Sequence, residues 1–126
     1  MPVKIETPNA PAAIGPYSQA VKANGFLFTS GQIPIEPQSG TIVAVDISGQ
    51  TRQVMANLAA ILAAEGLEFE HVVKTTIFLV DLADFARVSE IYGSYFEKDP
   101  PARSTVQVSA LPKGAKVEIE AVAALR

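Results

Sequence analysis

The residues best suited to chemistry are an arginine and a glutamate in the last quarter of the chain. Arg103 and Glu118 stand in two segments, residues 103–109 and 117–125, whose β-branched residues predict strands. A guanidinium matches a carboxylate through two parallel hydrogen bonds, and a glutamate orders water or carries a proton. On neighbouring strands the pair suits an anionic small molecule attacked by water. It equally suits a plain salt bridge, and the residues alone leave both open.

Alternation along these two strands predicts that both side chains lie on one face of the sheet. Successive side chains of a strand point to opposite faces, so the valine and isoleucine positions share a face that we expect to meet the helices. The opposite face then carries the polar residues Arg103, Thr105, Gln107, Glu118 and Glu120. A polar sheet face is more often simply solvated. The alternative is that it lines a pocket.

Turn signals and periodicity predict five strands and two helices in the order ββαβαββ. The three earlier strands span 18–22, 26–30 and 72–80, and Asn24-Gly25 predicts a hairpin between the first two. One helix is expected to begin at an N-cap on Ser48, and the other at an N-cap on Asp81 with an apolar stripe reaching Phe96. This pattern is typical of an α+β fold with both helices on one face of a single sheet.

Composition excludes several classes of function. The 126 residues, 48% hydrophobic, fit a single domain over 1–126, and without cysteine neither a disulfide nor a thiolate site can form. His71 is the only histidine, so no metal site is expected. A net charge of −3 without a basic stripe argues against a nucleic-acid partner. No apolar leader or membrane-length segment is visible, which favours a cytoplasmic protein.

Four short motifs follow one another along the chain. Residues 15–20 read G-P-Y-S-Q-A, residues 30–34 read S-G-Q-I-P, and residues 101–104 read P-A-R-S. The fourth is L-P-K at 111–113 with V-E-I-E at 117–120. Together they resemble the motifs of the Rid (YjgF/L-PSP) family. The resemblance covers nearly the whole chain without large gaps, and four motifs in this order are far more specific than any one of them.

The resemblance implies the chorismate-mutase-like fold, arranged as a homotrimer with a central β-barrel and the helices outside. Active sites would lie in clefts at the subunit interfaces. The implied activity is that of a 2-iminobutanoate/2-iminopropanoate deaminase. Such an enzyme hydrolyses reactive 2-imino acids, released by pyridoxal-phosphate-dependent dehydratases, to 2-keto acids and ammonia, and so protects other enzymes. No cofactor or metal would be needed, because a protonated C=N bond is already electrophilic.

The resemblance also implies a catalytic pair. Arg103 would bind the substrate carboxylate and fix its orientation. Glu118 would activate water or pass a proton to the leaving nitrogen.

Around this pair, the backbone N–H groups of Gly31 and Thr105 would support the carboxylate or an ordered water. Ser30 would line the pocket, and Tyr17 would close it from a neighbouring subunit.

Two positions depart from the family pattern. Ser89 stands where many deaminases of the family have asparagine, and Thr105 stands where they often have cysteine. The loss of the longer amide at Ser89 affects the expected substrate range. It also leaves open a regulatory module that binds small carboxylates without turnover. A third hypothesis, an endoribonuclease or translation inhibitor, is disfavoured by the sequence pI of about 5.1.

Overall fold

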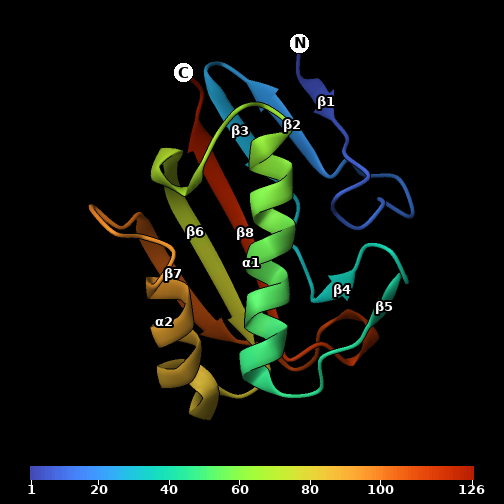
Figure 1. Ribbon diagram of the computed structural model, residues 1–126, viewed down its shortest axis with the longest axis vertical. Helices are drawn as coiled ribbons and strands as arrows, with labels where there is room; N and C mark the ends of the chain where they lie inside the picture. Colours follow the sequence, from blue (N-terminus) through green and yellow to red (C-terminus); the bar gives the residue numbers. More distant parts are fainter.

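The computed structural model describes residues 1–126 and is built on a six-stranded sheet covered on one face by two helices (Figure 1). The strand order in the sheet is β1-β2-β3-β8-β6-β7, antiparallel except for the parallel pair β6 and β7. The strands are β1 (Val3–Ile5), β2 (Ala20–Ala23), β3 (Phe26–Thr29), β6 (Val72–Leu79), β7 (Ala102–Gln107) and β8 (Val117–Ala124). The predicted α+β class and helix placement are therefore confirmed.

Three short strands were not predicted. Strand β1 pairs with β2 at one edge of the sheet, and β4 (Ile35–Glu36) forms a separate hairpin with β5 (Thr41–Ile42). Each contains only two or three residues. Segments this short show no alternation of apolar and polar residues by which a strand is recognised.

Both helices begin differently from the prediction. Helix α1 (Ile47–Ala63) has Asp46 as its N-cap, whose carboxylate accepts from the Gly49 backbone N–H at 3.1 Å, so the expected cap at Ser48 is wrong. Asp81 caps a short 3₁₀ turn, Leu82–Asp84, and α2 (Phe85–Gly93) follows it. Neither helix is long and apolar enough to cross a bilayer.

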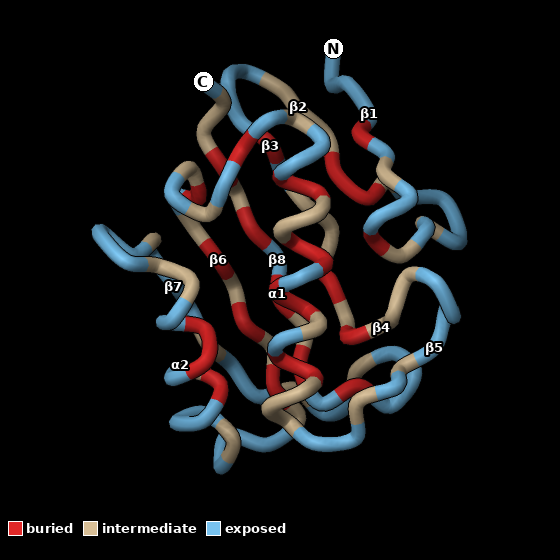
Figure 2. The backbone as a smooth tube through the Cα atoms, in the orientation of Figure 1, coloured by how far each residue is buried: buried red, intermediate tan, exposed pale blue.

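The core lies between the helices and the sheet, where buried positions alternate along the central strands (Figure 2). Val117 and Ile119 of β8 have no exposed surface, and the intervening Glu118 is half-buried on the other face. The largest fully buried apolar side chains are Leu27, Val54, Met55, Leu58, Ile61, Leu62, Ile77, Leu79, Val88, Val117 and Ile119. Burial of this set holds α1 and α2 on the sheet and so fixes which face β8 turns toward solvent.

The prediction for the faces of β7 is wrong. Arg103 pairs in register with Thr75, whose hydroxyl bonds to the Tyr92 hydroxyl of α2 at 2.7 Å, so Arg103 lies on the helix face. Val106 lies on the opposite face and is 43% exposed. Val106 therefore points away from the helices, onto a sheet face that is itself partly apolar. Phe26 and Phe28 of β3 lie on this uncovered face and are 40% and 42% exposed.

Candidate active site

A cavity of about 610 Å³ lies between the N-terminal loop, the segment after β3 and the loop before β8. It brings together four predicted site residues: Tyr17, Ser30, Gly31 and Glu118. We call it the Glu118 cavity. Its full lining is Pro11, Ala12, Ile14, Tyr17, Gln19, Ser30, Gly31, Gln32, Ile33, Ile35, Pro112, Lys113 and Glu118.

Gly31 lies directly against the Glu118 carboxylate. A Cβ atom at position 31 would be 1.9 Å from Glu118 Oε2, so only glycine allows this approach. Reciprocal backbone hydrogen bonds between Gln32 and Ile119, of 2.8 and 3.1 Å, join the two segments. The backbone at position 31 therefore forms one wall around the carboxylate.

The Glu118 side chain has no ion-pair partner in the chain. Its pKa is raised above the ordinary glutamate value of 4.5, first by burial and then by the nearby Glu120 carboxylate. A half-buried carboxylate whose charge is not neutralised is available to bind a proton from water or from a substrate nitrogen. Its environment therefore suits acid–base work better than structural pairing.

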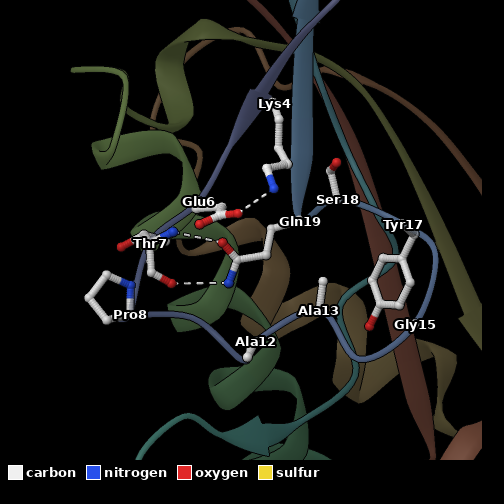
Figure 3. A pocket seen from close by; sticks show the side chains of 10 residues that line it. All are labelled: Lys4, Glu6, Thr7, Pro8, Ala12, Ala13, Gly15, Tyr17, Ser18 and Gln19. Carbon is white, nitrogen blue, oxygen red and sulfur yellow. Dashed lines mark hydrogen bonds and ion pairs between the residues drawn. The ribbon is translucent and has the colours of Figure 1, made fainter.

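The loop that carries Tyr17 is held by Gln19 (Figure 3). The buried Gln19 amide accepts from the Thr7 N–H at 2.7 Å and donates to the carbonyls of Thr7 at 3.0 Å and Pro11 at 2.7 Å. Ser30 fastens the far end of the loop, because its hydroxyl donates to the Ser18 carbonyl at 2.5 Å. These bonds hold Tyr17, which is 53% exposed, at the cavity rim.

Arg103 is held on a different part of the molecule. Its guanidinium lies 5.3 Å from the centre of the Phe85 ring and 5.4 Å from that of Tyr92, and it donates to the Ser89 hydroxyl at 2.8 Å. Stacking on two rings and one hydrogen bond restrict a side chain that would otherwise be mobile. The structure thus brings Arg103 and Ser89 together beside α2, with the guanidinium still exposed.

Arg103 and Glu118 do not meet within one chain. They lie on opposite faces of the sheet, and strand β6 separates β7 from β8. On β6, Arg103 pairs in register with Thr75, and Glu118 pairs with Phe78, three residues further along. Two strand spacings across the sheet and three residues along it place the Cα atoms of Arg103 and Glu118 roughly 14 Å apart. A cleft that uses both groups therefore needs two chains. Tyr17 shares the cavity of Glu118 within one chain, so in such a cleft it would lie on the subunit next to the one that carries Arg103.

Strand β7 is an edge strand whose outer backbone groups have no partner strand. The Val108 N–H donates to the Leu79 carbonyl of the neighbouring strand β6. In a parallel ladder every second residue directs its backbone groups to the same neighbour. Arg103 and Thr105 alternate with the residues that share the orientation of Val108, so their N–H groups point to the free edge. The Thr105 backbone thus lies at the free edge of the sheet, while its side-chain hydroxyl is buried without any hydrogen-bond partner.

Replacing Thr105 with valine is expected to stabilise the fold by about 1 kcal/mol, because it removes a buried hydroxyl that has lost its water without gaining a partner. Urea unfolding of Thr105→Val measures the change. The matched control is Thr75→Val, expected to lower the free energy of unfolding by about 1–2 kcal/mol, because the Thr75 hydroxyl bonds to Tyr92. Equal losses in both variants would contradict this account of Thr105.

Comparison with known proteins decides the family. The family model described as Endoribonuclease L-PSP matches residues 7–125, nearly the whole chain. The chain belongs to the Endoribonuclease L-PSP (Rid) family.

Relatives within this family carry several names. The chain is 60% identical over 121 residues to the protein DfrA of Myxococcus xanthus, covering 94% of this chain and 92% of the relative. It is 50% identical over 119 residues to the 2-iminobutanoate/2-iminopropanoate deaminase of Homo sapiens, covering 94% and 87%.

Solved structures of the Rid family match this fold over almost every residue. The conserved Rid-family protein YyfA of Yersinia pestis has a TM-score of 0.97 at 53% identity and covers 99% of this chain and 100% of its own. E. coli TdcF with bound serine has a TM-score of 0.92 at 47% identity and covers 98% of each chain.

Two residues of this Rid-family site were not predicted to act there. Gln19 lies within the G-P-Y-S-Q-A motif, but nothing in the motif indicates that its amide holds the loop. Lys113 lies within L-P-K, and only the folded turn brings it to the cavity. Long-range contacts of this kind leave no periodic signal in the sequence.

Proposed function

We propose that this protein hydrolyses 2-imino acids to 2-keto acids and ammonia. The observation that carries the proposal is the half-buried, unpaired Glu118 carboxylate in a cavity large enough for a small acid. The 50% identity to relatives named 2-iminobutanoate/2-iminopropanoate deaminase supports the same chemistry.

The proposed assembly is a homotrimer in which each active site lies between two subunits. Two features support it: the uncovered sheet face with exposed Phe26, Phe28 and Val106, and the free edge of β7. Apolar sheet faces and open edges are surfaces that proteins cover. Joining three copies through these surfaces would form the central barrel. It would also bring Arg103 and the Thr105 N–H of one subunit to the Glu118 cavity of the next.

In this arrangement the reaction needs two groups of the protein. Arg103 holds the substrate carboxylate, which fixes the imine carbon near Glu118. Ionised Glu118 takes a proton from water as the oxygen bonds to the imine carbon, giving a carbinolamine. Glu118 then returns the proton to the nitrogen, the C–N bond breaks, and the leaving ammonia takes the hydroxyl proton, so that the hydroxyl oxygen becomes the keto oxygen. Atoms and charge balance because protonated imine plus water gives keto acid plus ammonium.

The decisive assay couples the protein to a pyridoxal-phosphate-dependent dehydratase that releases 2-iminobutanoate from threonine. Semicarbazide captures the free imine, and the rate of semicarbazone formation is recorded. Added protein is expected to lower this rate in proportion to its concentration, because hydrolysis competes with capture. An unchanged capture rate at concentrations well above that of the dehydratase would exclude the proposed activity.

A second candidate is a binding module that holds small carboxylates without turnover. The related structure of TdcF with bound serine favours it, as does the shorter Ser89 beside Arg103. Titration with 2-oxobutanoate separates the two functions. Binding without any effect on imine capture would establish the module, whereas binding with accelerated loss of imine would establish the enzyme.

A further inference from the structure

The loop before β8 contains a turn whose sequence conflicts with its conformation. The Ala115 N–H donates to the Pro112 carbonyl at 3.2 Å, and both central residues have positive φ: Lys113 at 58° and Gly114 at 69°. This is the geometry of a type I′ turn, in which asparagine followed by glycine is strongly preferred. A lysine with ψ of 24° occupies the first central position instead.

The same chain contains the expected version of this turn. Asn24 and Gly25, between β2 and β3, have φ values of 51° and 83°. Asparagine tolerates the left-handed region because its short amide bonds locally, whereas a lysine Cβ crowds the following carbonyl there. Lys113 thus breaks a local rule that the chain obeys elsewhere, and such conflicts concentrate at functional sites.

Lys113 lies at the Glu118 cavity, where a cation would attract an anionic ligand. It and Glu118 are the two charged residues that line the Glu118 cavity. Lys113 is exposed and takes part in none of the ion pairs of the chain, so its charge is not neutralised by a neighbour. An unpaired cation at the mouth of a cavity attracts anions and raises their local concentration.

We infer that Lys113 is a specificity-determining residue that draws the carboxylate of 2-imino and 2-keto acids into the Glu118 cavity. This inference rests on the proposed function and adds a cation distinct from Arg103. Lys113 acts on entry and on the choice of anionic over neutral ligands. Arg103 acts on orientation after the neighbouring subunit has completed the site.

The test compares three variants, Lys113→Asn, Lys113→Arg and Lys116→Asn, by calorimetric titration with 2-oxobutanoate and its neutral amide. Lys113→Asn gives the turn its preferred residue, so any loss of binding cannot come from added backbone strain. Lys116 is an exposed lysine that does not line the cavity, which makes its variant the matched control for a lost surface charge.

Lys113→Asn is expected to weaken 2-oxobutanoate binding by roughly 3- to 10-fold at low salt, with the difference disappearing at high salt. Affinity for 2-oxobutanamide should stay unchanged, Lys113→Arg and Lys116→Asn should bind as wild type does, and the Tm of Lys113→Asn should rise. Equal losses for acid and amide, a loss as large in Lys116→Asn, or no loss in Lys113→Asn would each overturn the inference.

The outcomes for Lys113 and for the proposed function are separable. A wild-type chain that binds the keto acid but hydrolyses no imine disproves turnover, while the binding comparison still decides the role of Lys113. A wild-type chain that hydrolyses imine, with the same kcat/KM in Lys113→Asn at low salt, disproves the role of Lys113 alone. A wild-type chain that neither binds nor hydrolyses disproves both.

Discussion

Mixed trimers of two inactive variants, Arg103→Ala and Glu118→Gln, should recover about a third of the wild-type imine hydrolysis. Each variant alone should lose roughly 10²- to 10³-fold in kcat/KM, because one loses the carboxylate clamp and the other the proton carrier. In a trimer with head-to-tail contacts, a site is intact only when the Glu118→Gln chain supplies Arg103 and the Arg103→Ala chain supplies Glu118. About a third of the sites meet this condition in any trimer that contains both variants.

The physical basis of this expectation is the opposite placement of the two side chains on one sheet. Co-expression of the two chains with different tags, followed by purification through both tags, supplies mixed assemblies for the capture assay. The control is a double variant carrying both substitutions on one chain, co-expressed with itself, which should stay inactive. Activity that does not return in the mixed assemblies would contradict a site shared between subunits.

Glu118→Gln should lose activity and gain stability at the same time. The kcat is expected to fall by about 10²- to 10³-fold, because the amide neither takes nor returns a proton. Burial and Glu120 raise the pKa of the folded-state carboxyl, so the folded chain binds this proton more tightly than the unfolded chain does. The protonated Glu118 carboxyl therefore stabilises the folded chain fully below pH 4.5, the ordinary glutamate pKa. This contribution is lost as the pH rises through the raised pKa. Glu118→Gln should therefore have a higher Tm than wild type at pH 7, with the difference shrinking toward pH 4.

The pH dependence of kcat/KM provides a matched control. Ionised Glu118 is the form that activates water, so kcat/KM of the wild type should rise with pH along a limb whose midpoint lies above 4.5. Glu120→Gln removes the neighbouring charge that contributes to the raised pKa, and should move this limb to lower pH while leaving the kcat plateau intact. A limb that stays in place in Glu120→Gln would exclude Glu118 as its source.

Local signals predicted much of the fold because their physical causes are local. Asn24-Gly25 tolerates positive φ and forms the expected turn, and the apolar stripe of α1 packs on the sheet as its spacing predicted. The second helix is shorter than its stripe, which continues to Phe96, because the Ser94 hydroxyl bonds to the Ile91 carbonyl at the C-terminal end. Phe96 still packs against the core from outside the helix.

The amino-acid sequence by itself determined the residue types of the site, the order of the strands and helices along the chain, and the family resemblance. Only the tertiary structure decided that Arg103 faces α2 while Glu118 faces the uncovered side. Alternation divides a strand into two faces but does not say which face the helices cover. Which face of β7 meets the helices depends on residues distant in the sequence. Here the rings of Phe85 and Tyr92 stack on the Arg103 guanidinium, so a charged residue takes a position on the helix face that an apolar side chain would otherwise fill.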